Sequence, residues 1–318
     1  MKILVTGGAG YIGSILVKEL IEMNYKVRVM DMFNFGFDSL RGIVSNDNFE
    51  MIPGDIRKPE YVNKALDGID AVIHLAAIVG DPACTVNADV AIETNYLSTL
   101  RIAIAARDKG INKFIFASTC SVYGASDYKL TEDSSLNPQS LYAETKILAE
   151  KGIMDLETDE FKPVILRLGT LYGLSPRMRF DLVINYLIGK LIDEGKCKIF
   201  GGDQWRPFLH VSDAAKSFIF ALINYSRMRG KIYNVGNNDA NYQLKDIGYI
   251  LKCIFPELII EYIFEVKDNR SYNVSFERIE SLGFELHKNI KETIIEIKNY
   301  INKNKIDFND EKYYNYHP

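Results

Sequence analysis

The sequence predicts an α/β protein whose first half is a doubly wound parallel sheet and whose second half adds a smaller lobe. Short apolar runs alternate with helical patterns through the first half of the chain, and most of these runs are apolar on both faces. Parallel strands that are covered by helices on both sides show this pattern, because neither face meets water. The rhythm becomes irregular after about residue 170, which indicates a different architecture there.

Each element of the sheet can be placed from its own pattern. A helix is expected between the first two strands, where apolar residues recur at helical spacing from Ile12 to Met23. Longer helical patterns cover Asp89–Asp108 and Leu141–Leu156. The expected strands are Lys2–Thr6, Lys26–Asp31, Phe49–Pro53, Ala71–Ala76, Lys113–Ser118 and Pro163–Leu168.

The chain divides into two unequal parts and a tail. Residues 1–170 are expected to form the sheet, and residues 171–301 the smaller lobe, which is partly interleaved because 231–236 have the pattern of one more strand. Residues 302–318 are polar and rich in tyrosine, and we expect a loosely held tail. The last helix is expected to begin at a capping pair, Asn289 and Glu292. It carries four isoleucines on one face, namely Ile290, Ile294, Ile297 and Ile301. The other elements expected in the smaller lobe are a helix near Asp181–Glu194, strands around Lys198–Phe200 and Pro207–Val211, and a helix from Asp213.

Composition and charge exclude several classes of function. The 318 residues are 47% apolar and 25% charged, as in ordinary globular proteins, and the formal net charge of −4 offers no basic field for nucleic acid. No run approaches the roughly 18 apolar residues that a membrane span needs, and the N-terminus opens on a strand rather than a signal peptide. The cysteines form no CxxC pair, so neither a disulfide framework nor a metal site is expected. We therefore expect a cytoplasmic protein without nucleic-acid or membrane partners.

Three glycines stand three residues apart directly after the first expected strand, where the first helix begins. In such a loop one glycine permits the tight turn, one lets the backbone approach a pyrophosphate, and one lets helix and strand pack closely. Gly7, Gly10 and Gly13 occupy these positions, and Asp31 ends the second strand 18 residues after Gly13. An acidic side chain there accepts hydrogen bonds from the adenosine ribose hydroxyls and repels a 2′-phosphate. The pattern predicts NAD rather than NADP as the cofactor.

A tyrosine and a lysine stand four residues apart in the second long helical pattern, which places them on one face of the helix. Tyr142 has a reference pKa of about 10, so it can act as a base near neutral pH only if its neighbours favour the tyrosinate. Lys146 and a positive nicotinamide ring would both do so. Thr119, at the end of a strand, can hydrogen-bond to the same substrate oxygen. Together with the glycine loop, these residues predict a site of hydride transfer.

The GxxGxxG spacing of the three glycines resembles the extended short-chain dehydrogenase/reductase family, in particular the nucleotide-sugar branch that includes the UDP-glucose 4-epimerases. The resemblance continues through nearly the whole chain and implies a Rossmann fold, bound NAD, and a catalytic triad of Thr119, Tyr142 and Lys146. It also implies that Tyr142 and Lys146 contact the cofactor. The other positions that it assigns to cofactor binding are Tyr11, Ile12, Asp55, Ile56, Leu75, Ala76, Ala77 and Asn95.

The second half of the chain carries arginines suited to a nucleotide diphosphate, because planar guanidinium groups bind phosphate oxygens bidentately. Arg206 and Arg270 match the family arginines that reach this diphosphate. Arg177 and Arg179 lie where the chain enters the second lobe, and we expect them to face the substrate together with Thr119. The predicted ligand is therefore a nucleotide sugar.

The sequence also departs from the family pattern. Thr170 replaces the usual asparagine, Pro207 replaces an aspartate, and Ser275 stands where many members have an aspartate, so the nucleotide and the sugar stay open. Nucleotide-sugar 4,6-dehydratases resemble this family but carry Asp-Glu directly after the triad threonine, as acid and base for removing water. Cys120 and Ser121 occupy those positions here, so dehydration is not expected.

These observations favour an NAD-dependent 4-epimerase, which oxidises C4 of a nucleotide-linked sugar transiently. A 4-dehydrogenase or ketoreductase acting on a hexose or heptose would use the same residues and release its product, and the segment Ser175–Arg179 resembles a branch that contains such a GDP-heptose dehydrogenase. A catalytically silent NAD-binding regulator is a third hypothesis, although such proteins usually lack the tyrosine or the lysine. The long helices at Asp89–Asp108 and Leu141–Leu156 resemble the pair through which the family forms dimers, so a homodimer is expected.

The cofactor preference tests the interpretation of Asp31. A carboxylate close to a 2′-phosphate creates like-charge repulsion, so Asp31→Ala is expected to narrow the difference in affinity between NAD and NADP. Titration of both dinucleotides into the unaltered protein and the variant measures this difference. An unaltered protein that prefers NADP would show that the role given to Asp31 is wrong.

Overall fold

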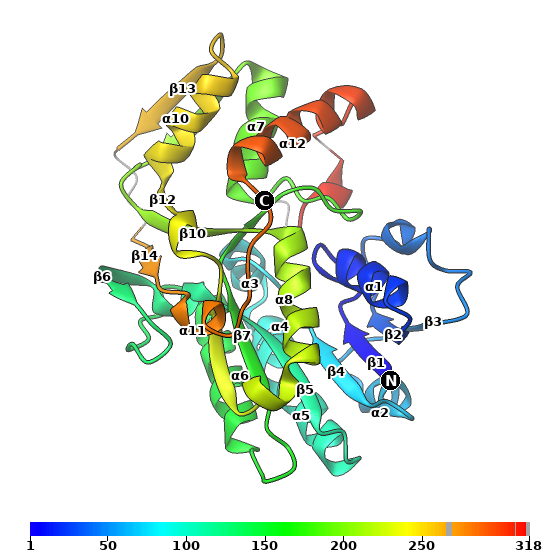
Figure 1. The fold of residues 1–318 in the computed structure, drawn as a ribbon. Helices are drawn as coiled ribbons and strands as arrows, with labels where there is room; N and C mark the ends of the chain where they lie inside the picture. Colours follow the sequence, from blue (N-terminus) through cyan, green and yellow to red (C-terminus); the bar gives the residue numbers. More distant parts are fainter. Residues whose placement is uncertain (265–268, 309, 316–318) are drawn as a thin grey trace.

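The parallel sheet predicted for the first half of the chain is present. The computed structural model describes residues 1–264, 269–308 and 310–315, and at its centre lies a sheet of seven parallel strands with helices on both faces (Figure 1). The order across the sheet is β11 (Lys231–Val235), β7 (Val164–Leu168), β5 (Lys113–Thr119), β4 (Ala71–His74), β1 (Lys2–Thr6), β2 (Lys26–Asp31) and β3 (Phe49–Pro53).

The strand order reverses between β1 and β4, and ligands of open α/β sheets bind at the carboxyl ends of the strands at such a point. β4 ends at His74 rather than at Ala76 as predicted. The backbone N–H of Leu75 donates to the Thr6 carbonyl (3.1 Å), and that of Ala76 donates to the Thr6 hydroxyl (3.3 Å). The chain after β4 is therefore turned across the end of β1.

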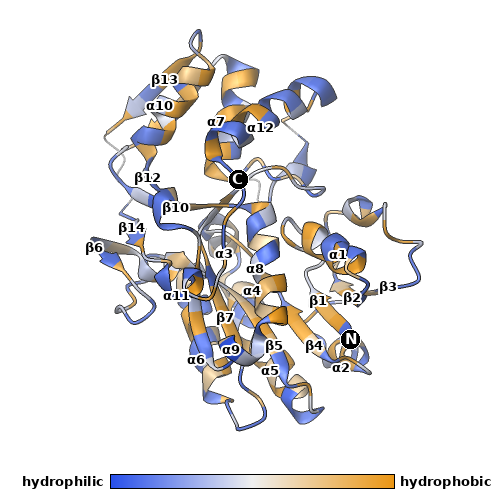
Figure 2. Cartoon of the chain, viewed as in Figure 1, coloured by the Kyte–Doolittle hydropathy of each residue, from blue (hydrophilic) through white to orange (hydrophobic). Residues whose placement is uncertain are grey.

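Hydrophobic residues pack on both faces of the sheet, as the strand pattern predicted. Strands such as β1 and β4 are coloured as hydrophobic in Figure 2. Ile3 and Val5 face one side, where α1 (Gly13–Glu22) and α8 (Val211–Ile223) pack, while Leu4 faces α2 (Pro59–Leu66), α5 (Thr99–Asp108) and α6 (Leu141–Asp155) on the other. α8 lies within the residues expected to form the second lobe. It covers the sheet instead, because Phe218 and Leu222 belong to the same core as β1.

The helix predicted at Asp89–Asp108 is interrupted near its start. After α3 (Asp81–Val86), the chain forms α4 (Ala88–Ile92), a π-helical turn η2 (Glu93–Ser98) and then α5. Asn95 lies in this wide turn and is fully buried. π-Helical turns are rare and often occur at functional sites.

A second lobe lies beyond the carboxyl ends of the sheet and has its own core (Figure 1). Its last helix begins as predicted, because the Asn289 side chain accepts the N–H groups of Lys291 and Glu292. The isoleucines predicted for its inner face are all buried. The lobe consists of α7 (Val183–Glu194), α10 (Leu244–Ile254), α12 (Ile290–Asn304), the sheet β12 (Asn241–Gln243), β10 (Trp205–His210), β8 (Thr170–Tyr172), and the pair β13 (Ile259–Ile263), β9 (Lys196–Phe200).

The segment after α12 is packed where the structure describes it. Phe308 and Tyr313 contact the Phe180 ring edge-on, with centroids 5.0 and 5.3 Å away. The Phe180 N–H donates to the Tyr313 carbonyl (2.9 Å), and the Asn315 N–H donates to the Asp181 carboxylate (3.3 Å). The prediction of a loose tail is wrong for these residues, because the aromatic side chains give this polar segment an apolar face.

The remaining elements are short. Among the described residues, no helix combines the length and the apolar character that crossing a bilayer requires. β6 pairs with β14 beside the second lobe. The remaining short elements are η1 (Asp38–Leu40), η3 (Cys120–Tyr123), β6 (Ala125–Leu130), α9 (Tyr225–Met228), η4 (Asn238–Ala240), β14 (Ser271–Val274), α11 (Glu277–Glu280) and η5 (Glu311–Tyr313).

A buried ion pair joins α6 to the sheet. The Arg167 guanidinium on β7 donates to both oxygens of Glu150 on α6, at 2.7 and 3.0 Å, and both side chains are nearly inaccessible to solvent. The Ser118 hydroxyl donates to the same carboxylate, and a further Arg167 N–H donates to the Tyr123 hydroxyl (2.9 Å). Because Glu150 lies one helical turn from Lys146, this network fixes the helix that carries the predicted catalytic pair.

Removal of one partner is expected to destabilise the fold strongly. Glu150→Leu leaves the Arg167 charge buried without its carboxylate, and such a change costs about 3–5 kcal/mol of unfolding free energy. Urea denaturation measures the loss. The double variant Glu150→Leu/Arg167→Met should lose less than the two single variants together, since it buries no uncompensated charge. Strictly additive losses would contradict this account of the pair.

Candidate active site

The glycine loop joins β1 to α1 with almost no space for side chains. Gly7 has φ +72°, and a Cβ atom on it would lie 2.8 Å from the backbone nitrogen of Ala76. A Cβ on Gly13 would lie 2.2 Å from the Gly7 carbonyl oxygen. On Gly10 it would meet only that carbonyl, at 3.1 Å, so the loop is less crowded here. These positions agree with the predicted turn, close packing and ligand approach.

Asp31 ends β2 beside this loop, as predicted. One of its carboxylate oxygens accepts the Ala9 N–H (3.0 Å) and the other accepts the Phe33 N–H (2.8 Å). Burial raises the pKa of this carboxyl group. Each oxygen keeps a second lone pair, so Asp31 can fix the loop and still accept a hydrogen bond from a ribose hydroxyl.

The other residues predicted for cofactor binding line the neighbouring strand ends. Leu75, Ala76 and Ala77 follow β4 and are partly buried. The Asn95 side chain accepts the Ile78 N–H (2.8 Å) and donates to the Ile78 carbonyl (2.9 Å), so it fixes this stretch rather than facing open space.

Two residues after β3 share the same edge of the site. Ile56 is buried, whereas the Asp55 carboxylate is bound by the Arg57 guanidinium at 2.6 and 2.9 Å. Asp55 therefore shapes the turn through its own ion pair.

A buried histidine supports the strand ends beneath the loop, and sequence reasoning missed it. His74 lies between the hydroxyls of Thr6 (2.6 Å) and Thr99 (2.9 Å), and burial lowers its pKa to about 3. The ring is therefore neutral and acts as a hydrogen-bonding bridge between β1 and α5. An isolated histidine in an apolar strand gives no signal of this role.

Thr119, Tyr142 and Lys146 lie at the carboxyl end of β5 and on the adjoining α6. α6 begins at this point because Ser140 caps it, accepting the Ala143 N–H. The Lys146 ammonium donates to the Ala117 carbonyl (2.9 Å), and its nitrogen lies 5.9 Å from the centroid of the Tyr142 ring. Lys146 is thus fixed on the same helix face as Tyr142, as the spacing predicted.

Burial dominates the ionisation of both catalytic candidates. It raises the pKa of Tyr142 above the ordinary value, and it lowers the pKa of Lys146 to about 8. Arg179 partly offsets the effect on Tyr142. The expectation that lysine would depress the phenol is therefore not met by the protein alone. Formation of the tyrosinate needs further positive charge, which the oxidised nicotinamide ring of a bound cofactor carries.

The surroundings of Tyr142 include residues from both lobes that sequence reasoning did not assign. Cys84, Asp81 and Tyr272 are its ionisable neighbours besides Arg179. The Tyr272 hydroxyl lies 3.4 Å from the Ser121 hydroxyl, and Ser121 accepts from the Thr119 hydroxyl (3.1 Å). Their signal in the sequence was only their proximity to the predicted motifs.

The structure brings the two predicted diphosphate-binding arginines together. The Arg206 guanidinium donates to the Arg270 carbonyl and lies 5.2 Å from the centroid of the Tyr272 ring. The Arg270 guanidinium pairs with Asp81 across the two lobes at 2.6 Å. Both arginines therefore lie near the Tyr272 side of the catalytic group.

Arg177 and Arg179 lie in a different place, against the glycine loop. The Tyr11 hydroxyl donates to the Gly173 carbonyl (2.6 Å), and the Ser175 hydroxyl donates to the Tyr11 carbonyl (2.7 Å). Arg179 lies 5.9 Å from the Tyr11 ring centroid. The predicted cofactor residue Tyr11 thus joins the loop to the second lobe, with Ile12 partly buried beside it.

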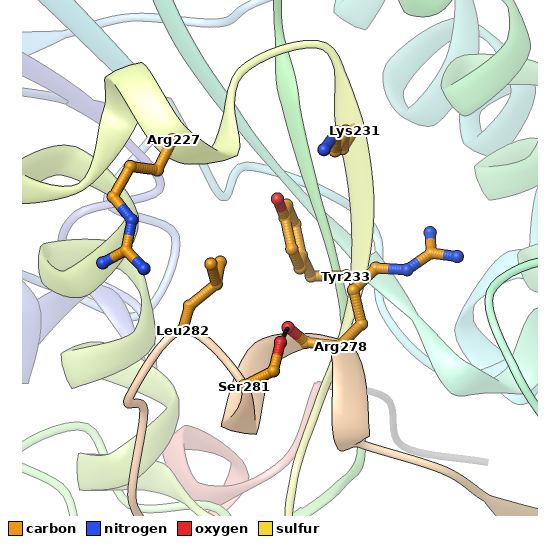
Figure 3. Close-up of a pocket in the computed structure, with 6 residues that line it drawn as sticks. All are labelled: Arg227, Lys231, Tyr233, Arg278, Ser281 and Leu282. Carbon is orange, nitrogen blue, oxygen red and sulfur yellow. Dashed lines mark hydrogen bonds between the residues drawn. The ribbon is translucent and has the colours of Figure 1, made fainter.

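The pocket drawn in Figure 3 lies at the opposite end of the sheet. Lys231 is the first residue of β11, so the pocket is at the amino ends of the strands, whereas Thr119 and the glycine loop are at the carboxyl ends. This position separates it from the catalytic group. The pocket has a volume of about 410 Å³ and is lined by Arg227, Lys231, Tyr233, Arg278, Ser281 and Leu282.

The residues at the carboxyl ends fit a dinucleotide. The close-packed glycines at the start of α1 leave a cradle that a side chain would fill, and the buried Nε of Arg177 has no hydrogen-bond partner beside it. Within the described part of the chain, no three histidine, cysteine, aspartate or glutamate residues are grouped to hold a metal ion.

A parallel sheet with a GxxGxxG loop after β1 and a Tyr-xxx-Lys helix beside β5 is the arrangement of the short-chain dehydrogenase/reductase class of proteins. The chain belongs to the NAD dependent epimerase/dehydratase family, whose model matches residues 3–236. This confirms the predicted family, the Rossmann-type fold, the enzymatic character and NAD as the cofactor.

Three comparisons show how close known members are. The chain is 34% identical over 260 residues to a Bacillus subtilis protein described as an uncharacterized UDP-glucose epimerase, covering 79% of this chain and 81% of the relative. It is 31% identical over 300 residues to a bovine (Bos taurus) dTDP-D-glucose 4,6-dehydratase, covering 89% and 83%. The solved UDP-glucuronic acid 4-epimerase of Bacillus cereus, in complex with UDP-glucuronic acid and NAD, superposes with a TM-score of 0.83 at 27% identity and covers 95% of this chain and 99% of that one.

Substitution of the predicted base tests the catalytic group. Tyr142→Phe keeps the ring but removes the proton acceptor, and loss of a general base typically lowers the rate by about 10²–10⁴. Lys146→Met should also be slow, but its activity should recover partly as the pH rises, because more tyrosinate then forms. Thr119→Ala should be milder than either. Turnover of the accepted nucleotide sugar between pH 6 and 10 measures these effects.

The matched control is Tyr128→Phe, at a tyrosine that is 82% exposed and outside the site. NAD binding by Tyr142→Phe should stay close to that of the unaltered protein. Near-normal turnover by Tyr142→Phe would contradict the assignment of the base.

Proposed function

We propose that the protein is an NAD-dependent 4-epimerase of a nucleotide-linked sugar. Tyr142 removes the proton of the C4 hydroxyl, and Thr119 orients the same oxygen through its hydroxyl group. NAD, which the glycine loop and Asp31 would hold, would supply the acceptor and donor of the C4 hydride, so that return of the hydride to the opposite face of the keto sugar inverts C4. The proton then passes back from Tyr142, so that substrate and product differ only in configuration and the cofactor is regenerated.

The observation that carries this proposal is the turn η3 directly after Thr119. Elimination of water needs an acid and a base beside the hydride-transfer site, and no carboxylate stands in this turn. The Cys120 thiol is buried and donates to the Arg167 carbonyl (3.3 Å), and burial raises its pKa far above neutral. Ser121 does not ionise near neutral pH. The η3 turn therefore supplies neither the acid nor the base of a dehydratase to a ketone at C4, which favours return of the hydride over loss of water.

The two second-lobe arginines support a nucleotide diphosphate as the part of the substrate that the protein binds. The Arg206 guanidinium contacts the backbone of Arg270 and lies near Tyr272, and guanidinium groups keep their charge while binding phosphate oxygens bidentately. A sugar attached to a diphosphate bound there has rotatable bonds, about which the ketone can turn its other face to the nicotinamide. The family relatives named above act on UDP- or dTDP-linked sugars, which is consistent with this substrate class.

We further propose a homodimer, formed through the helices at residues 88–108 and α6. Leu97 and Ile104 are each 38% exposed, and Leu148 on α6 is 44% exposed. Apolar side chains of this size on two neighbouring helices are suited to cover the same helices of a second copy.

A panel of nucleotide sugars separates the possible reactions. The protein is denatured to identify the nucleotide it carries, and fresh protein is then incubated with UDP-, dTDP-, GDP- and CDP-linked hexoses and heptoses while NMR follows the sugar and absorbance follows NADH. A 4-epimer that forms without net NADH is the expected result. The Tyr142→Phe variant should form none.

Other products would point elsewhere. Stoichiometric NADH with a released ketone would identify a dehydrogenase, for which the residues Ser175–Arg179 gave the sequence argument. A 4-keto-6-deoxy sugar would identify a dehydratase and would contradict the argument from Cys120 and Ser121.

A further inference from the structure

Arg177 was expected at the substrate, yet its neighbours belong to the cofactor half of the site. Its guanidinium carbon lies 3.9 Å from the centroid of the Phe35 ring, in the loop that follows β2. Asp31 and Tyr11 are among the charged and ionisable groups that influence it. Arg177 therefore lies between the end of β2 and the glycine loop, where the adenosine side of a dinucleotide binds in this fold.

The protein alone leaves this guanidinium incompletely paired. Its side chain is buried, one N–H donates to the Tyr314 carbonyl (3.4 Å), and its Nε has no hydrogen-bond partner. Asp181 is bound by Arg179 instead, at 2.7 and 2.9 Å. Burial accordingly lowers the pKa of Arg177 to about 10. A buried cation with an unsatisfied N–H is costly, and an anion beside it removes that cost.

The second lobe fixes the segment that carries Arg177 from two sides. On the inner side, the Ser175 hydroxyl and the Gly173 carbonyl are hydrogen-bonded to Tyr11 of the glycine loop. On the outer side, Phe308 and Tyr313 pack against Phe180, and the Asn315 N–H donates to Asp181. The position of Arg177 over the cofactor half is therefore built into the fold.

We infer that Arg177 binds a phosphate group of NAD and that Phe308 and residues 313–315 keep the arginine there, so that the cofactor stays on the protein between turnovers. This inference rests on the proposed epimerase, in which NAD is regenerated in every cycle and has no need to leave. It moves Arg177 from the substrate to the cofactor, and it gives the end of the chain a role in cofactor retention.

Exchange of the cofactor tests the inference without any substrate. Protein loaded with NAD is mixed with an excess of isotopically labelled NAD, and mass spectrometry after rapid gel filtration follows the replacement. Arg177→Gln removes a charge-assisted contact and should speed exchange by about tenfold to a hundredfold. Arg177→Lys keeps the charge and should be intermediate. Phe35→Leu, at a ring that is 45% exposed, removes the stacking partner and should speed exchange by a smaller factor.

The matched control is Arg41→Gln, at an arginine between β2 and β3 whose side chain is 78% exposed, and its exchange should equal that of the unaltered protein. Thermal unfolding of each variant without NAD shows whether the fold is retained. Unchanged exchange in both folded Arg177→Gln and Phe35→Leu would overturn the inference. A raised KM for the nucleotide sugar with unchanged exchange would return Arg177 to the substrate and overturn it as well.

The exchange measurement and the test of the proposed epimerase activity can fail independently of each other. Fast exchange in Arg177→Gln supports the cofactor contact whatever product the NMR panel detects. If the unaltered protein itself exchanges NAD faster than it turns over substrate, retention between turnovers is wrong even where the phosphate contact holds.

Discussion

The close approach of two backbones at the carboxyl ends of β1 and β4 is the constraint on which the site depends. Gly7 lies against Ala76 and Gly13 against Gly7, with no room for a side chain at either contact. Because the backbones touch, the first turn of α1 starts directly above the sheet and its free N–H groups face the crevice. The Thr6 and His74 side chains then hold the end of β4 in place beneath the loop. A larger residue at Gly7 or Gly13 would displace helix, strand and crevice together.

Tyr11 transmits this constraint to the second lobe. Its hydroxyl is buried and donates to the Gly173 carbonyl, and the Asn185 amide on α7 donates to the same hydroxyl (3.1 Å). The glycine loop and the lobe that carries the arginines are therefore one hydrogen-bonded unit. Tyr142, which has neighbours from both lobes, has an environment that depends on this unit staying intact.

Sequence reasoning succeeded where short-range pattern decides the outcome. Apolar runs placed the strands of the sheet, the glycine spacing placed the tight loop between β1 and α1, and the Tyr142–Lys146 interval placed both side chains on one face of α6. Sequence reasoning failed where contacts between distant residues decide the local conformation. The π-helical turn at Asn95 depends on the Ile78 backbone that it binds, and the packing of Phe308 and Tyr313 depends on Phe180, more than a hundred residues earlier. Arg177 was predicted to face the substrate, because the sequence does not show that it packs on Phe35 in the loop after β2.

The turn η3 has an evolutionary consequence, because it separates the choice of reaction from the machinery of hydride transfer. The two positions after Thr119 differ in accessibility: Cys120 is buried against β7, whereas Ser121 is partly exposed toward Tyr272. A carboxylate could be gained at position 121 by a single tolerated substitution, but at position 120 it would place a charge in the core and require neighbouring residues to change first. Members of such a family can thus share one scaffold, although the acid at position 121 is easy to acquire and the acid at position 120 is not. Lineages would be expected to acquire the accessible acid before the buried one.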